Sequence, residues 1–477
     1  MIADDHSVHM TDLWGNNVLT NSNACIQCIN SYYLEVLAYG SKQKVILRAV
    51  EEDPNCALAH VLSALYFLRF DSSKALAHIE TAKRCLLNST HERSYERMAY
   101  LAAEALVKMQ SDLALIEYSK ILTEFPKDLF SLKKAQVLCF YMGKCDESVR
   151  LASQVLPWNN DEAYMHGMLA FSLLETQRFD EAERAARKAL MIRSDDKWAQ
   201  HALCHVLQYR CLFQDAIQFM EKQSESWNDC CIFMYSHNWW HLAVSYLDWG
   251  GSHSINKVID IYDNHLWPCK SQVLDSSVQG LLSALGLLLR LQVKGFTESV
   301  KERIYQLTQN IQDDSVWHKE KLLDLLMIWS WAYIGGETYR NRLRELQERL
   351  SNQIENKGLR MFMKVAKGLN EYGKGNFEKA FNAMGSEIQL DELKVIGASD
   401  EQLDIFEELW CLLALHTGHL EEVYSVLKKR TITFPGSPST WDLMAEFHRQ
   451  RGSSDEWKKA QMKAFNIKQG YHRFMSC

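Results

Sequence analysis

The chain has 477 residues, of which 47% are hydrophobic and 11% aromatic, with only six prolines and 21 glycines. This composition suits a folded, helical chain with few long loops, and it excludes the all-β and collagenous classes. The formal net charge of −7 provides no general attraction to a phosphate backbone or to anionic lipid, so we expect neither nucleic acid nor a membrane as a partner.

Two segments and the cysteines bear on the cellular compartment. The N-terminus, Met1 to His6, lacks the apolar stretch of a secretion signal, and the most apolar window, Leu281 to Leu291, is too short to span a membrane. The 13 cysteines are too sparse for a disulfide framework, which favours reduced thiols. Cys25 and Cys28 have zinc-ligand spacing, but without a second pair we interpret them as one apolar face of a helix. We therefore expect a cytoplasmic protein.

Four small residues recur at a fixed interval of 34 positions, at Ala114, Ser148, Ala182 and Ala216. Mostly small residues at the eighth and twentieth places of a 34-residue unit are typical of the tetratricopeptide repeat, a helix-turn-helix that buries its apolar face against copies of itself. The sequence therefore predicts an all-α fold, an α-solenoid of tetratricopeptide-type repeats that forms a right-handed superhelix, either open or closed.

The repeat frame divides the chain into four regions. They are an N-terminal helical cap at 1–55, a regular tetratricopeptide array at 56–268, divergent helical hairpins at 269–358, and C-terminal repeats with a cap at 359–477. Four units of the array stand in unbroken register, with first positions at Tyr95, Leu129, Ala163 and Lys197. In the divergent region, apolar spacing predicts helices over 272–293, 316–334 and 338–354, with linkers at 309–315 and 335–337.

One stripe of each repeat is predicted to line the inner, concave wall of the solenoid. Places 2, 5, 9 and 12 of the first helix form that stripe, at 100° per residue. Between residues 164 and 241 the stripe and its edge are rich in aromatic rings and imidazoles. The candidate binding residues there are Tyr164, Phe171, Glu175, Trp198, His201, His205, Gln208, His237, Trp240 and His241.

The histidines of this wall form two pairs. His201 and His205 are one helical turn apart, and His237 and His241 repeat that spacing on the next equivalent helix, about 10 Å away. Four imidazoles on facing turns can hold a transition metal, bind a ligand carboxylate, or change charge near neutral pH. Ordinary hydrogen bonds between repeats are the interpretation that we favour, so we assign no metal and no cofactor.

Motifs for catalysis are absent from the sequence. Ala202 stands where a metalloprotease motif between His201 and His205 needs a glutamate, and there is no nucleophile elbow or phosphate-binding loop. Cys204 occupies the small-residue packing place, which favours an inert, buried thiol. We therefore predict no catalytic residues.

The segment His237-Asn238-Trp239-Trp240-His241, with His201 and His205 upstream, resembles the tetratricopeptide repeat protein 38 family. A second segment, Gly397 to Phe406, resembles that family's glycine-x-serine motif, and the likeness in order and spacing covers roughly residues 15 to 430. Members can carry a third histidine followed by glutamate, where this chain has Leu207 and Gln208. The resemblance implies a helical-repeat fold and no particular activity.

The second segment contains Ser399, Gln402 and Asp404, which are candidates for a second polar site. The alternative, which we favour, is a helix start in which Ser399 caps the helix and Gln402 bonds back to it.

These patterns favour a non-catalytic binding scaffold. Its inner groove, centred on residues 164–241, would hold an extended peptide or a partner helix, because a solenoid offers an elongated surface and aromatic rings offer rigid contact area. The alternative is a closed pocket for a small molecule or a metal, with an enzymatic reaction of unknown type. The oligomeric state stays open.

Overall fold

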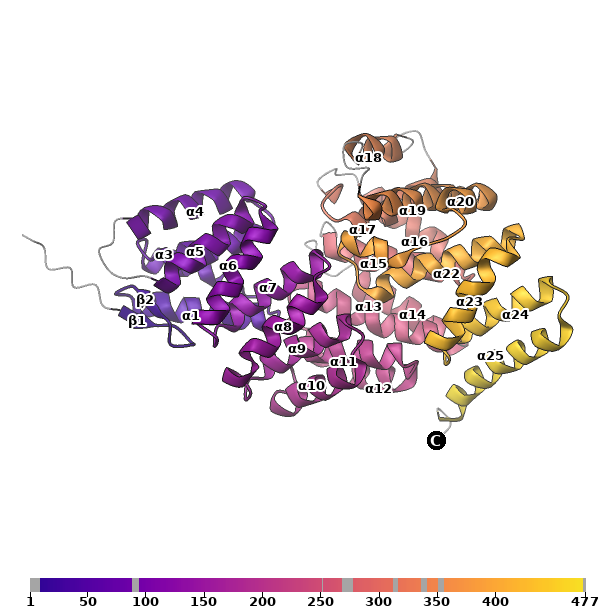
Figure 1. The fold of residues 1–477 in the computed structure, drawn as a ribbon, viewed down its shortest axis with the longest axis horizontal. Coiled ribbons are helices and arrows are strands. Elements are labelled where there is room, and N and C mark those ends of the chain that lie inside the picture. Colours follow the sequence, from indigo (N-terminus) through magenta and orange to yellow (C-terminus); the bar gives the residue numbers. More distant parts are fainter. Residues whose placement is uncertain are drawn as a thin grey trace, which may run out of the picture. The chain divides into compact units, whose positions relative to one another are not determined.

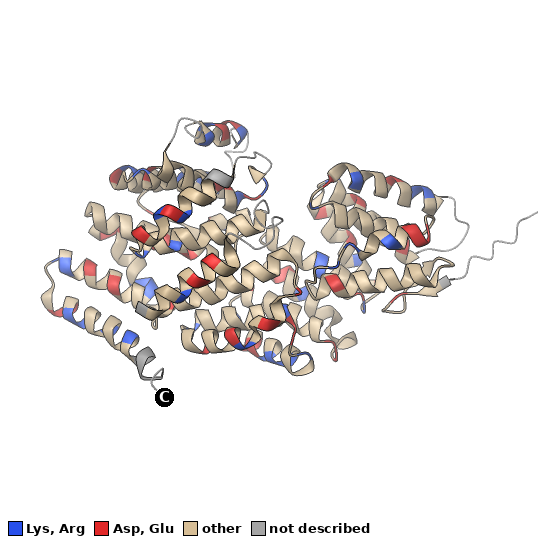
Figure 2. Cartoon of the chain, turned by 180° about the vertical axis from the view of Figure 1, so that it is seen from behind, with Lys and Arg blue, Asp and Glu red and all other residues tan. Residues whose placement is uncertain are grey.

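The computed structural model describes residues 9–87, 94–250, 252–267, 278–311, 316–335, 341–350 and 356–474. Within these ranges the chain is an all-α helical-repeat protein of the α-solenoid class, in which successive helices pair through short turns (Figure 1). The predicted fold class is thus confirmed. Acidic and basic residues are interspersed along the helices (Figure 2).

The chain divides into two compact units. Unit 1 comprises Met1–Leu203 with Asn228–Cys231, and unit 2 comprises Cys204–Trp227 with Ile232–Cys477. The boundary between them runs through helix α11, Lys197–Tyr209.

Unit 1 begins with a strand pair, and the remaining elements are helices. They are β1 His9–Thr11, β2 Asn17–Leu19, α1 Asn23–Leu37, α2 Val45–Glu52, α3 Ala57–Phe67, α4 Ser72–Leu87, α5 Ser94–Val107, α6 Ser111–Glu124, α7 Leu129–Tyr141, α8 Cys145–Val155, the 3-10 turn η1 Leu156–Trp158, α9 Ala163–Glu175 and α10 Phe179–Ile192.

Unit 2 continues the helical pairing after α11. Its elements are α12 Phe213–Gln223, η2 Ser224–Trp227, α13 Ile232–Trp249, α14 Ser252–Ile261, the π-helix η3 Tyr262–Leu266, α15 Val278–Val293, α16 Thr297–Asn310, α17 Lys321–Ile334, α18 Arg342–Leu350, α19 Lys357–Gly373, α20 Phe377–Met384, α21 Leu390–Leu393, η6 Lys394–Ile396, α22 Asp400–Thr417, α23 Leu420–Thr433, α24 Pro438–Gln450 and α25 Ser454–Phe474.

The repeat register agrees with the helix boundaries. Leu129, Ala163 and Lys197 are the first residues of α7, α9 and α11, and Tyr95 is the second residue of α5. The four small residues at the 34-residue interval are buried where paired helices pack together. Small side chains are needed at these positions, because larger ones would hold the helices apart. Their positions are Ala114, Ser148, Ala182 and Ala216.

In the N-terminal region, a strand pair that the sequence did not predict precedes the helices α1 and α2. β1 and β2 pair antiparallel, with His9 opposite Leu19. The turn between them forms because the Asp12 carboxylate accepts hydrogen bonds from the backbone N–H groups of Trp14 and Asn16, at 3.0 and 2.9 Å. Gly15, at φ +82°, takes the left-handed conformation that glycine favours. A short aspartate-to-glycine turn of this kind carries no helical periodicity.

The divergent region contains one helix more than the spacing predicts. α15, α17 and α18 correspond to the three predicted helices, whereas α16 lies where no helix is predicted. It starts after a turn at Gly295, at φ +87°. Parts of the predicted linkers, 312–315 and 336–337, lie outside the described residues.

Unit 2 brings its late helices back to its early ones. α22 packs against α15, and α24 packs against α13 (Figure 1). The guanidinium of Arg290 on α15 donates to the backbone carbonyl of Glu401 at the start of α22. Lys294, one turn further along α15, lies 3.2 Å from both Asp248 and Glu408. These buried contacts fix the first turn of α22 close to α13.

The length and hydropathy of the described helices show whether any of them could cross a membrane. None of them combines the length and the apolar character needed to cross a membrane.

Candidate functional site

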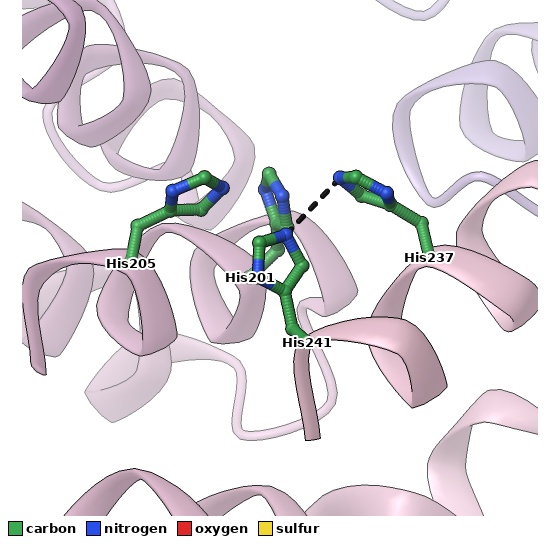
Figure 3. A group of neighbouring side chains, drawn as sticks. All are labelled: His201, His205, His237 and His241. Carbon is green, nitrogen blue, oxygen red and sulfur yellow. Dashed lines mark hydrogen bonds between the residues drawn. The ribbon is translucent and has the colours of Figure 1, made fainter. Parts of the chain in front are cut away.

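Four imidazoles converge from α11 and α13 (Figure 3). His201, His205, His237 and His241 are all buried, and each offers one possible ligand nitrogen, with these nitrogens all within 4.8 Å of one another. His205, His237 and His241 belong to unit 2, and the continuous helix α11 places His201 one turn before His205. The i,i+4 spacing explains the convergence, because it puts both rings of a pair on one helix face.

A carboxylate, Glu401, completes this cluster within unit 2. Its Oε2 atom lies 3.1 Å from Nδ1 of His205, and its Oε1 atom lies 3.8 Å from Nε2 of His241. The Ser399 hydroxyl donates to Oε1 at 2.7 Å. Glu401 is not among the residues predicted from the sequence, although it lies inside the segment Gly397 to Phe406. No local spacing could connect it with histidines on α11 and α13.

Hydrogen bonds hold His241 in place from the side away from Glu401. The side-chain oxygen of Gln208 lies 3.0 Å from Nδ1 of His241, and the Gln208 amide nitrogen donates to the His241 carbonyl at 3.1 Å and to the Ser245 hydroxyl at 2.9 Å. On the other side of the ring, Nε2 of His241 lies 3.2 Å from Nε2 of His237. Two imidazole nitrogens therefore face each other beside a carboxylate.

Burial and the neighbouring imidazoles set the charges of the cluster. Burial pushes the pKa of Glu401 upward, but the nearby imidazoles of His205 and His237 and the hydrogen bond from the Ser399 hydroxyl prevail and lower this pKa to about 2. Burial lowers the pKa of His237 to about 4, against the attraction of Glu401. At neutral pH, Glu401 is thus a carboxylate and His237 is neutral.

The Glu401 carboxylate has no strongly basic counter-ion. Among the described residues, no lysine or arginine forms an ion pair with it, and Arg290 contacts only its backbone carbonyl. A buried carboxylate normally requires a compensating positive charge. Its contacts in this cluster include the imidazoles of His205 and His241 and the Ser399 hydroxyl.

The predicted aromatic residues are buried against one another and against charged groups. Phe171 and Trp198 lie 4.6 Å apart between ring centroids, and Trp198 stacks on His201 at 4.7 Å. In unit 2, the Trp240 ring is parallel to His237, with centroids 5.8 Å apart. The guanidinium carbon of Arg193 lies 5.2 Å from the ring centroid of Tyr164.

These rings and the histidines expose little surface. Exposed fractions are 7% for Tyr164, 6% for Phe171, 8% for Trp198, 8% for Gln208 and 3% for Trp240. Glu175, at the end of α9, is only partly buried. The residues expected to line a groove therefore mostly form packed interior.

The second candidate site resolves into helix capping and an ion pair. Ser399 and Gln402 form a capping box at the start of α22, in which the Gln402 side-chain oxygen accepts from the Ser399 backbone N–H at 3.1 Å. Asp404 pairs with Arg430, at 2.6 Å between Oδ1 and the guanidinium. The favoured interpretation of Ser399 and Gln402 as a helix start is confirmed. The Ser399 hydroxyl also donates a hydrogen bond to Glu401.

No protein-family model matches the chain. Among solved structures, the human IFIT1 dimer with m7Gppp-AAAA aligns at a TM-score of 0.43 and 13% identity, over 91% of this chain and 95% of that chain. The human IFIT1 dimer with PPP-AAAA aligns at 0.42 and 13%, over 91% and 94%. Yeast Tom70 aligns at 0.27 and 12%, over 78% and 76%. The chain is TPR-like, as its own helix pairs already indicate.

The expectation that excludes nucleic acid requires correction. The solved IFIT1 chains are seen with capped or triphosphate RNA. The expectation rested on net charge, which averages over the whole surface, whereas binding depends on the local field of a groove or pocket. The exclusion of nucleic acid is therefore withdrawn.

Proposed function

We propose that this chain is a cytoplasmic binding scaffold related to the tetratricopeptide repeat protein 38 family, and that it holds one divalent transition-metal ion at His205, His237, His241 and Glu401. The observation that carries the proposal is the convergence of three buried imidazoles on a partly buried carboxylate that lacks a lysine or arginine partner among the described residues.

The geometry supports a metal for two reasons. Zinc–nitrogen bonds of about 2.0–2.1 Å in a tetrahedral site place neighbouring ligand atoms roughly 3.3 Å apart. The Nε2 atoms of His237 and His241 are 3.2 Å apart, and Nδ1 of His205 lies 3.1 Å from Glu401. In addition, a cation between these groups would supply the positive charge that favours a partly buried carboxylate. Imidazole with a carboxylate suits zinc, iron, cobalt or nickel.

A peptide groove lined by the predicted aromatic residues has less support. Trp198 and Trp240 are both buried. Lys133 and His201 already cover the Trp198 ring. His237 and Arg290 cover the Trp240 ring. A peptide would have to displace these contacts. A protein partner that binds elsewhere on the scaffold is compatible with the metal proposal.

Elemental analysis tests the proposal directly. The full chain, purified without a polyhistidine tag and dialysed against buffer, is expected to carry about one equivalent of a transition metal, or to take up about one equivalent of Co²⁺ with a visible d–d spectrum. The double variant His205→Gln/His237→Gln should lose this metal.

A matched control is available in unit 1. His60 and His78 also form a close pair, with their Nδ1 atoms 3.0 Å apart, but within the part of the chain that the structure describes neither forms an ion pair with a carboxylate or a hydrogen bond with a third imidazole. His60→Gln/His78→Gln should therefore leave the metal content unchanged. The proposal fails if the wild-type chain takes up no Co²⁺, or if the two double variants lose it equally.

A further inference from the structure

We infer that Gln208 is a positioning residue that makes His241 a metal ligand, by holding its ring in the form that carries the proton on Nδ1. The inference rests on the proposed metal function and deepens it. Its basis is a set of hydrogen bonds whose donors and acceptors can be assigned by chemistry alone.

The first step fixes the orientation of the Gln208 amide. The Ser245 hydroxyl donates its only proton to the His241 carbonyl, at 2.9 Å, so its oxygen must accept from Gln208. The His241 carbonyl is also an acceptor only. The Gln208 group that contacts both of them, at 2.9 and 3.1 Å, is therefore the NH₂ group.

The second step fixes the tautomer of His241. With its NH₂ group directed at Ser245 and the carbonyl, Gln208 presents its side-chain oxygen to Nδ1 of His241, at 3.0 Å. An amide oxygen accepts only, so Nδ1 must carry a hydrogen. In the neutral ring Nε2 then holds the lone pair, and this atom faces His237 and Glu401. A metal-binding histidine needs this arrangement, in which its other nitrogen donates to a fixed acceptor.

A comparison with an earlier repeat distinguishes the positioning of His241 by Gln208 from an ordinary packing contact. In unit 1, Gln136 donates to the Met168 carbonyl at 2.7 Å and to the Ser172 hydroxyl at 3.0 Å, and Ser172 donates to the same carbonyl at 3.2 Å. The glutamine bridge between neighbouring repeats is thus a structural device of this fold.

The two repeats differ in what meets the glutamine oxygen. Met168 stands in the place of His241, and the side-chain oxygen of Gln136 is buried without a hydrogen-bond partner among the described residues. In unit 2 the same oxygen receives the imidazole N–H. The contact with His241 is therefore an addition to the bridge.

The test compares Co²⁺ affinity among three substitutions. Gln208→Met removes both the bridge and the acceptor, and should weaken Co²⁺ binding by about 10–100-fold. Gln208→Glu keeps an acceptor oxygen for Nδ1 but lacks the NH₂ donors, and should stay within roughly threefold of the wild type. Gln136→Met removes the equivalent bridge in unit 1 and should leave Co²⁺ affinity unchanged.

The outcomes separate the inference from the function on which it rests. If Gln208→Met and Gln208→Glu weaken binding equally, or if neither does, Gln208 is only a bridge and the inference is overturned. If the wild type binds no Co²⁺, the proposed function itself fails. Circular dichroism verifies folding, and Gln208→Asn, whose shorter side chain cannot reach Nδ1, replaces Gln208→Met if that variant does not fold.

Discussion

The ammonium group of Lys133 lies 3.9 Å from the ring centroid of Trp198 in unit 1. A second ring, Tyr39, lies 4.3 Å away on the same ammonium group, and no carboxylate forms an ion pair with it among the described residues. Burial lowers the pKa of Lys133 well below its usual value. The attraction of the ring faces only partly offsets the cost of burying a charge.

Replacement of Lys133 by methionine should therefore stabilise unit 1. The thioether fills the same space without a buried charge, and we expect the free energy of unfolding to rise by about 1–3 kcal/mol at pH 7. The pKa of Lys133 is lower in the folded state than in the unfolded state, so at pH 7 the wild type is destabilised by this difference. As the pH rises toward 10, Lys133 also loses its proton in the unfolded state, and the stability advantage of the methionine variant should shrink. Urea unfolding at both pH values measures this, and a destabilised variant at pH 7 would contradict it.

A second prediction concerns Asp128, the N-cap of α7. Its buried carboxylate accepts from the Ser131 backbone at 2.9 Å and from the Tyr95 hydroxyl at 3.0 Å, yet burial raises its pKa to about 6. A folded pKa above the unfolded value means that the protonated form contributes stability below about pH 4, and that this contribution is lost as the pH rises through 6. Relative to Asp128→Asn, the wild type should thus be about 2–3 kcal/mol more stable at pH 4 than at pH 7.5.

Calorimetry of the wild type and Asp128→Asn across that pH range provides the measurement. Asparagine keeps the oxygen that caps the helix, so the cap itself is preserved. A stability difference that is independent of pH would refute the assignment.

A third prediction concerns Arg430, which joins α23 to α22. Its guanidinium lies 2.6 Å from Asp404 and 2.7 Å from Glu407, and it is 3% exposed. Arg430→Met should cost about 2–4 kcal/mol, because it leaves two partly buried carboxylates without their counter-ion. The double variant Arg430→Met/Asp404→Asn should recover part of that loss, and strictly additive effects in the double-mutant cycle would argue against this coupling.

The metal proposal predicts a stability effect as well. A ligand that binds only the folded state at a concentration 100 times its Kd adds about 2.7 kcal/mol, which corresponds to a rise in Tm of about 5–11 °C for a domain of 150–250 residues. Differential scanning fluorimetry with Co²⁺ and then with a chelator should show this rise and its reversal. His237→Gln should show neither, whereas His60→Gln should behave as the wild type does.

The sequence predicted the fold in detail because a repeat leaves a local signal. The 34-residue interval placed Leu129, Ala163 and Lys197 at the first positions of their helices, and the i,i+4 spacing identified both histidine pairs. The capping box at Ser399 and Gln402 is likewise local and was found.

The remaining features depend on contacts between distant segments. Glu401 reaches His205 only because α22 returns to α15, and no periodicity encodes that return. The burial of Trp198 depends on Lys133 and Tyr39, which come from other helices, so a stripe that is predicted to face a groove is covered instead. The strand pair at His9–Thr11 and Asn17–Leu19 is too short to produce a periodic signal.

The position of Glu401 has a consequence for synthesis on the ribosome. The chain emerges from its N-terminus, so the imidazoles of His205, His237 and His241 leave the ribosome long before the carboxylate that contacts His205. Until α22 is made and docks on α15, these rings face their surroundings without it. The cluster can therefore be completed, and can bind a metal ion with all of its ligands, only after α22 has been synthesised and has folded onto α15.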